Sequence, residues 1–120
     1  MNIGESGEMY LETLLILSKE NENVRSNDLA VKMGFSRPSV CRAVKLLRQD
    51  QLISVDGSGF LTLTNSGREI AEKIYERHNV ISAFFESIGV SSETASEDAC
   101  RIEHVISDES FDKLKKHFGK

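Results

Sequence analysis

The stretch that decides the fold is Ser26–Asp50, which reads SNDLAVKMGFSRPSVCRAVKLLRQD in this chain of 120 residues. Its opening serine is expected to cap a short helix over Asn27–Met33, and Gly34 ends that helix in the left-handed conformation that favours glycine. Ser36 then caps a second helix, which carries Pro38 in its first turn. Two helices joined by a short glycine-containing turn predict a helix-turn-helix, whose second helix is the recognition helix.

The predicted recognition helix lies in the most basic part of the chain. Between Leu29 and Gln49 there are five basic residues and no acidic one, although the net charge of the whole chain is −4. This local charge favours a polyanion, and double-stranded DNA is the polyanion that a helix-turn-helix binds. The residues expected to contact DNA are Arg25, Ser36, Arg37, Pro38, Ser39, Arg42 and Lys45.

Individual residues in this set predict particular contacts. Arg42 is suited to guanine, and Pro38 with its small neighbours is suited to the methyl group of thymine. The alternative interpretation is that the basic residues form only a solvated helix face. Cys41 is either a buried helix residue or faces the DNA groove.

Two short apolar segments follow the recognition helix. Residues 52–55 and 60–63 alternate like half-buried strands, and Asp56-Gly57-Ser58-Gly59 between them is typical of a tight hairpin. A hairpin directly after a recognition helix is the wing of a winged helix. Because two strands alone are marginally stable, we expect the hairpin to pack on the helices.

Helical segments flank the winged helix on both sides. Before the winged helix, residues 5–19 are expected to form the first helix of the chain, with Ser6 as its cap. After it, a fourth helix of about 24 residues is expected to start after Thr64, which caps it. This long helix carries more apolar side chains than a small winged helix can cover, which favours burial against a second copy of the chain. A fifth helix, capped by Ser91 or Ser92, and a short sixth helix follow.

A group of potential metal ligands lies in the fifth predicted helix. In Cys100-Arg101-Ile102-Glu103-His104 the thiol, carboxylate and imidazole share one helix face. This donor set suits a late first-row divalent metal better than Mg²⁺ or Ca²⁺. Eleven acidic residues against three basic ones between Glu69 and Asp112 also favour cations. The alternative is a solvated helix face with a small buried cysteine.

Five strings of the sequence resemble the diphtheria toxin repressor family of metal-dependent transcriptional repressors, which has iron-responsive and manganese-responsive branches. They are GEMYLETLLIL at 7–17, FSRPSV at 35–40, LTLTNSGREIA at 61–71, ERHNVI at 76–81 and, most specifically, EDACRIEHVISDE at 97–109. The resemblance covers nearly the whole chain. It implies an N-terminal winged helix, a helical dimerisation domain and an activating divalent metal.

The resemblance also implies which residues hold this metal between the first helix and the dimerisation helices. The matching ligand positions are Met9, His78, Cys100, Glu103 and His104. Glu12 coincides with a ligand of the manganese branch and is expected to share an ion with His78. His78 alternatively is a polar residue at the subunit boundary, and Glu12 alternatively is a solvated residue of the first helix.

The same resemblance predicts the identity of the metal. Met9 and Cys100 follow the iron branch, where the manganese branch has carboxylates, so Fe²⁺ is the expected effector and Mn²⁺ the alternative. Zn²⁺ or Co²⁺ is expected to substitute in vitro. The second site of the iron branch has a carboxylate and an imidazole where this chain has Ser82 and Ser96. The chain is also expected to be a short form without the SH3-like domain of longer members.

The sequence therefore predicts a mainly α fold with two domains. Residues 1–70 form a winged helix-turn-helix DNA-binding domain, and residues 71–120 form an all-α metal-binding and dimerisation domain. No apolar run approaches the roughly 20 residues of a membrane span, and two distant cysteines do not make a disulfide scaffold. We expect a cytoplasmic homodimer with operator DNA as its partner and no membrane contact.

The expected function is that of a metal-dependent repressor, which binds a palindromic operator and controls metal-homeostasis genes. One alternative is a manganese-responsive repressor of the same family. Another is a metal-independent winged-helix regulator whose Cys/Glu/His cluster is structural. A third is an enzyme with Cys100 as nucleophile and His104 or His78 as base, for which the sequence offers no orienting acid or oxyanion loop. We therefore predict that the protein is not an enzyme.

Overall fold

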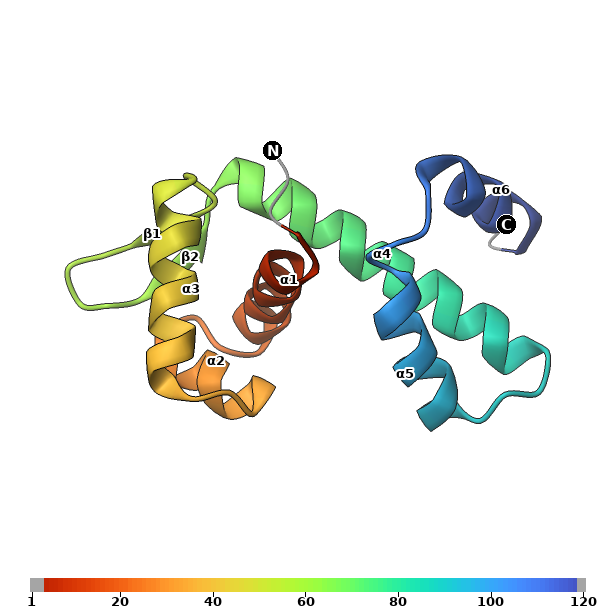
Figure 1. The fold of residues 1–120 in the computed structure, drawn as a ribbon, viewed down its shortest axis with the longest axis horizontal. Coiled ribbons are helices and arrows are strands. Elements are labelled where there is room, and N and C mark those ends of the chain that lie inside the picture. The colour runs from red at the N-terminus through yellow and green to blue at the C-terminus, as the bar shows by residue number, and fades with distance from the viewer. Residues whose placement is uncertain (1–3, 119–120) are drawn as a thin grey trace. The chain divides into compact units, whose positions relative to one another are not determined.

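The computed structural model describes residues 4–118, and the chain divides into two compact units between Glu72 and Lys73. The predicted mainly α fold is confirmed, since six helices and one small hairpin make up the described part of the chain (Figure 1). The elements are α1 (Gly4–Glu20), α2 (Ser26–Met33), α3 (Arg37–Gln49), β1 (Ile53–Val55), β2 (Leu61–Leu63), α4 (Asn65–Ser87), α5 (Ser92–Ile102) and α6 (Asp108–Phe118).

The helix-turn-helix consists of α2 and α3. Gly34 ends α2 with a φ of 72°, and the hydroxyl of Ser36 caps α3 by accepting a backbone N–H at 3.3 Å, both as predicted. The predicted cap at Ser26 is wrong, because α2 already includes this residue and Arg25 precedes it. The Asp28 carboxylate accepts the backbone N–H of Arg25 at 2.8 Å. A carboxylate in the first turn stabilises the helix because it accepts a backbone hydrogen bond and because its negative charge interacts favourably with the positive end of the helix dipole.

The helix α1 contacts α2, α3 and β2 within the N-terminal unit (Figure 1). The core of this unit contains Leu11 of α1, Leu29 of α2 and Val40 of α3, each of which is fully buried. The predicted cap at Ser6 is wrong, since α1 already extends to Gly4 and Ser6 lies within the helix. Serine inside a first turn costs a helix little, so a possible cap in the sequence does not fix where the helix starts.

The wing is an antiparallel hairpin of β1 and β2 with Ser54 opposite Thr62 at its centre. Each strand is one residue shorter than predicted. Asp56 closes the turn, because one of its carboxylate oxygens accepts the backbone N–H groups two and four residues later, both at 2.9 Å. An isolated bridge between Val24 and Leu61 ties the hairpin to the chain before α2. The wing is also packed on the helices as expected, because β2 contacts α1 and β1 contacts α3.

The C-terminal unit contains most of α4 together with α5 and α6. Thr64 caps α4 as predicted, with its side-chain oxygen accepting the backbone N–H of Gly67 at 3.1 Å, and α5 is capped by Ser91. One buried apolar cluster of this unit joins all three helices through Ile81, Ala99 and Phe111. Within the described residues, no helix has the length and apolar character to cross a membrane.

Gly67 marks a close approach between the first turn of α4 and the segment before β1. A Cβ atom at this position would lie 2.0 Å from the carbonyl oxygen of Leu52. Thr64 reinforces the junction, because its hydroxyl donates to the Gln51 carbonyl at 2.7 Å and its backbone N–H donates to the Leu52 carbonyl at 3.1 Å. The start of α4 is therefore seated on the backbone of the preceding segment, with space for glycine alone.

We expect Gly67→Ala to lower the free energy of unfolding by about 1–3 kcal/mol, because the overpacking outweighs the better helix propensity of alanine. Denaturant unfolding followed by circular dichroism measures the change. Gly57→Ala is the matched control, since a Cβ there meets nothing within 4 Å and the stability should stay within about 0.5 kcal/mol of wild type. Equal stability of the two variants would contradict the close approach.

Candidate metal centre and nucleic-acid interface

Glu103 is the most completely buried charged residue of the C-terminal unit, with 0% of its surface exposed. The sequence predicts Glu103 and His104 inside the fifth helix, but α5 ends at Ile102 and both residues lie in the turn that follows. The backbone of Glu103 is still helical, with φ of −57° and ψ of −27°, and its N–H donates to the Ala99 carbonyl at 2.8 Å. Cys100 still precedes Glu103 by three residues, but in the part of the chain that the structure describes the ligand atoms of Cys100, Glu103 and His104 do not all lie within 4.8 Å of one another.

Two imidazoles flank the Glu103 carboxylate. Its Oε1 accepts a hydrogen bond from His78 Nδ1 at 2.8 Å, and its Oε2 lies 3.3 Å from His104 Nε2. This Oε2 atom accepts no hydrogen bond of normal geometry from the described residues, although it is buried. A buried carboxylate oxygen with a free lone pair is a position that a cation stabilises. The residues present therefore fit a metal ion.

Cys100 and His78 line one surface pocket of the C-terminal unit. The pocket has a volume of about 560 Å³ and also includes Glu93, Ser96, Glu97 and Arg101. His78 Nε2 lies 3.4 Å from the hydroxyl of Ser96, and the Cys100 residue is half-buried. Thiol, carboxylate and imidazole side chains, which are donor types that late first-row divalent metals can bind, therefore line one pocket.

Met9 and Glu12, the remaining predicted ligands, are three residues apart on one face of α1 in the N-terminal unit. Glu12 is only 8% exposed, which is unusual for a carboxylate, and Met9 is half-buried. Their assignment as metal ligands rests on the family resemblance.

Arg77 is a feature of this centre that the sequence pattern did not reveal. Its side chain is 7% exposed, and it donates to the carbonyls of Glu103 and Ile106 at 3.2 and 2.9 Å and to the carboxylate of Asp108. Its guanidinium also lies 5.5 Å from the centre of the Phe111 ring. The sequence feature that could have identified Arg77 is that it is one of only three basic residues in the acidic region between Glu69 and Asp112. Each of these basic residues is a candidate for an ion pair with a neighbouring acid.

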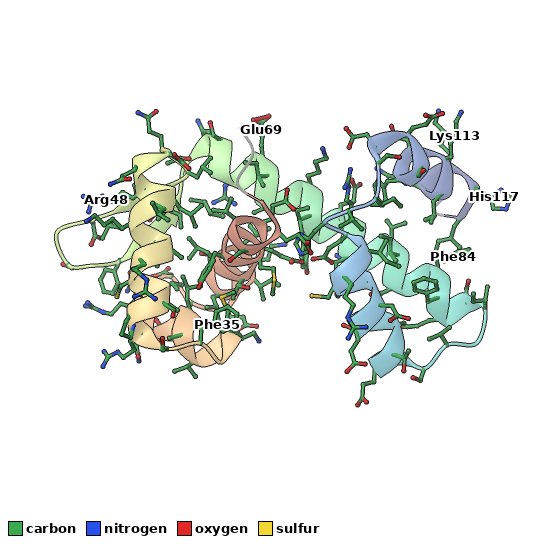
Figure 2. All side chains as sticks on the ribbon, viewed as in Figure 1. Phe35, Arg48, Glu69, Phe84, Lys113 and His117 are labelled. Carbon is green, nitrogen blue, oxygen red and sulfur yellow. The ribbon has the colours of Figure 1, made fainter. Side chains whose placement is uncertain are left out.

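The predicted DNA contacts in α3 and at its N-cap, Ser36, are mainly exposed. Those exposed are Ser36, Arg37, Pro38, Arg42 and Lys45. Ser39 is half-buried, and its hydroxyl accepts hydrogen bonds from the Ser36 hydroxyl at 2.9 Å and from Arg42 Nη2 at 3.4 Å. Arg48 extends from α3 on the side of the wing (Figure 2). The exposed face of α3 thus presents several cations beside a hairpin.

Arg25 differs from the other predicted DNA contacts because the wing already engages its guanidinium. Its Nη1 donates to the Ser58 carbonyl at 2.7 Å, and its Cζ lies 4.4 Å from the centre of the Phe60 ring. A hydrogen bond and a cation–π contact to the same hairpin hold the wing against the start of α2. Arg25 remains exposed, so its other N–H groups are accessible to a phosphate.

Cys41 is exposed, so the alternative that it is a buried helix residue is wrong. It lines a hollow of about 270 Å³ between α3 and the wing, together with Lys45 and Arg48. The thiol therefore lies on the same side of α3 as these two cations.

Comparison with known proteins matches both halves of the chain to one family. Residues 2–59 match the family described as "Iron dependent repressor, N-terminal DNA binding domain". Residues 64–120 match the family described as "Iron dependent repressor, metal binding and dimerisation domain".

Individual relatives extend over most of the chain. An uncharacterized HTH-type transcriptional regulator of Methanocaldococcus jannaschii is 34% identical over 115 residues, which are 94% of this chain and 92% of that protein. Transcriptional regulator MntR of Escherichia coli O6:H1 is 33% identical over 88% of this chain and 68% of its own length. The solved structure of the manganese regulator SloR matches 99% of this chain with a TM-score of 0.84 and 28% identity. This chain spans 55% of that structure.

The ion pairs around Asp108 predict an acid-dependent stability. A hydrogen bond and the charge of Lys73, at 3.0 Å, and then the charge of Arg77 hold the pKa of Asp108 below its ordinary value of 3.8. The carboxylate therefore stabilises the fold above pH 3.8 and loses this contribution as the pH falls through its lower folded pKa.

We expect Asp108→Asn to have a lower Tm than wild type at neutral pH and the gap to close as the pH falls below 3.8. Thermal unfolding at a series of pH values measures this gap. Asp112→Asn is the control, because Asp112 is exposed on the same helix and has no ion pair with the described residues. A gap that is independent of pH would contradict the assigned role of the charge.

Proposed function

Because this chain belongs to the diphtheria toxin repressor family of metal-dependent transcriptional repressors, a family of regulators rather than enzymes, we propose that it is a dimeric repressor activated by Fe²⁺. The observation that carries the proposal is the buried Glu103 carboxylate, which has an imidazole beside each of its oxygens. The Cys100 thiol precedes it by about one helical turn. A metal ion bound there would be shared by thiolate, carboxylate and imidazole ligands, and its positive charge would compensate the two anionic ones.

The proposed ligands of the C-terminal unit are Cys100, Glu103 and His104. Because Glu103 engages His78 Nδ1, only Nε2 of this imidazole is left for a metal ion, and it faces Ser96 at 3.4 Å. His78 is therefore proposed to orient the Glu103 carboxylate and to serve a second ion through Nε2. The family resemblance adds Met9 to the first ion, and it adds Glu12 as the residue that shares the second ion with His78.

Two opposing observations bear on the identity of the metal. The thioether of Met9 and the thiolate of Cys100 are soft donors, which favour Fe²⁺ over Mn²⁺. The likeness to a protein named as a manganese regulator favours Mn²⁺, which is therefore the second candidate. Zn²⁺ and Co²⁺ are expected to occupy the same ligands in vitro, because nitrogen and sulfur donors bind both ions well.

The proposed nucleic-acid partner is a double-stranded operator read by α3. Ser36 and Pro38 are exposed at the start of this helix, the end that meets base edges in helix-turn-helix proteins. Arg42 can pair with guanine through two hydrogen bonds, a contact that contributes about 1–3 kcal/mol of base discrimination. Lys45 is proposed to neutralise a phosphate, and Arg25 is proposed to hold the wing beside the duplex.

Exposed apolar side chains of the C-terminal unit support the proposed homodimer. Ile88 is 63% exposed and Val105 is 69% exposed. Phe84 of α4 is half-buried and meets the ring of Phe118 edge-on, with 5.7 Å between the ring centres (Figure 2). A two-fold dimer covers such side chains and requires a palindromic operator, proposed to lie near metal-homeostasis genes.

We expect Fe²⁺ to increase the affinity for operator DNA by roughly 5- to 150-fold, the usual range of coupling between two ligands of one protein. The probe is a DNA fragment selected from a random pool with Fe²⁺ present. An anaerobic DNA-shift titration with and without Fe²⁺ measures the ratio, and Mn²⁺, Co²⁺ and Zn²⁺ are compared in the same way.

Glu103→Gln is the matched variant for this titration. It keeps the size of the side chain but removes the buried charge, so the metal response should disappear while metal-free DNA affinity remains. Equal affinity of wild type with and without every metal would instead support a metal-independent regulator whose cluster is structural.

We expect the double change Met9→Asp and Cys100→Glu to shift metal preference from Fe²⁺ toward Mn²⁺, because it replaces two soft sulfur donors with hard oxygens. The measurement is the ratio of the two dissociation constants under anaerobic conditions. Cys41→Ser removes the other thiol and should leave this ratio unchanged. An unchanged ratio in the double variant would mean that the sulfur donors do not set the preference.

A further inference from the structure

We propose that Arg77 is a positioning residue of the metal centre, which holds the turn carrying Glu103 and His104 in the geometry that a metal ion needs. This inference rests on the proposed function, because it assigns to Arg77 a role in metal binding beyond its role in folding. Arg77 is not itself a ligand, since a guanidinium has no acceptor atom and remains protonated.

The contacts of Arg77 all lead to the turn between α5 and α6 or to the start of α6. Nη1 donates to the carbonyl of Glu103 at 3.2 Å and to that of Ile106 at 2.9 Å. Nη2 donates to the Asp108 carboxylate, and the guanidinium lies over the ring of Phe111. The two carbonyls bracket His104 in the sequence, so one side chain holds the backbone on both sides of a proposed ligand.

Burial makes these contacts obligatory rather than optional. The Arg77 side chain is 7% exposed and stays charged, so it must find acceptors in place of water. Its Nε atom is buried and makes no hydrogen bond with the described residues, which leaves the two terminal nitrogens to satisfy the group. A turn that moved away from α4 would leave a buried cation uncompensated, and this cost holds the turn in place.

Adjacent residues of α4 act on the same ligand. Arg77 holds the backbone carbonyl of Glu103, while His78 donates to the side-chain carboxylate of Glu103 at 2.8 Å. The turn's own backbone bonds, from the N–H groups of Val105 and Ile106 to the Ile102 carbonyl, shape it locally but do not attach it to α4. Arg77 therefore supplies a direct hydrogen-bonded link between the ligand backbone and the neighbouring helix.

The expected effect is on metal affinity, because ligands displaced by fractions of an ångström bind a metal ion poorly. Loss of a partner that orients a metal ligand typically weakens metal affinity by about 10- to 100-fold. A merely structural Arg77 would lower thermal stability and leave the affinity of the folded molecules unchanged. The two roles are therefore separated by measuring affinity and stability on the same variants.

The experiment uses the full chain and two substitutions of Arg77. Arg77→Met removes the charge and all hydrogen bonds, and Arg77→Lys keeps the charge but has one nitrogen in place of the two that now reach three acceptors. Anaerobic Co²⁺ titration, followed by the visible absorption bands of the bound ion, gives affinity and ligand geometry, and circular dichroism gives the folded fraction and the Tm.

Lys115→Met is the matched control. Lys115 pairs with Glu76 of α4 at 2.5 Å from the exposed side of α6, so its loss also removes a link between these helices without touching the turn. We expect this variant to bind Co²⁺ within twofold of wild type.

The proposal is supported if Arg77→Lys, at a temperature where it is fully folded, binds Co²⁺ at least tenfold more weakly than wild type and shows altered absorption bands. It is overturned if wild type binds Co²⁺ and both folded Arg77 variants bind equally well with the same spectrum. If Arg77→Met does not fold, Arg77→Lys alone decides between these outcomes. Absence of Co²⁺ binding in wild type would overturn the proposed function itself, which a change confined to the variants would not.

Discussion

The burial of the Glu103 carboxylate is the constraint on which the C-terminal unit depends. A carboxylate without exposed surface loses its hydration, and the free energy of this loss must be offset by hydrogen-bond donors or by a cation. Here α4 supplies the donor from His78, and the turn supplies the imidazole of His104. One carboxylate oxygen still has an open acceptor position. The proposed metal-binding role of Glu103 and its place in the folded core therefore belong to the same side chain.

The second buried charge of this unit explains why the turn after α5 has a defined position. Arg77 lies one residue before His78 on α4, so the helix presents a guanidinium and an imidazole to neighbouring parts of one turn. Asp108 and Lys73 continue this arrangement toward the surface, where the pKa of Asp108 is held low. Because a buried charge must be compensated, Arg77 and Glu103 fix the position of a turn that forms few backbone hydrogen bonds of its own.

In the N-terminal unit, several charged side chains bind backbone groups. The Asp28 and Asp56 carboxylates bind nearby N–H groups, so each closes a local structure, the start of α2 and the turn of the wing. Gly67 has a different role, because it allows α4 to start directly on the Leu52 carbonyl. Arg25 then joins the wing to α2 through Ser58 and Phe60. These interactions fix the start of α2, the turn of the wing and the start of α4.

The sequence by itself determined the order of the helices, the wing, the caps at Ser36 and Thr64, and the family, because these follow from local spacing and residue type, and it narrowed the cap of α5 to Ser91 or Ser92. It misassigned the caps at Ser6 and Ser26 and the end of the fifth helix, where several local conformations are nearly equal in free energy. Only the tertiary structure decided the exposure of Cys41, the close approach at Gly67 and the burial of Arg77. These features join residues far apart in the sequence, and burial and charge compensation exist only after the helices have packed.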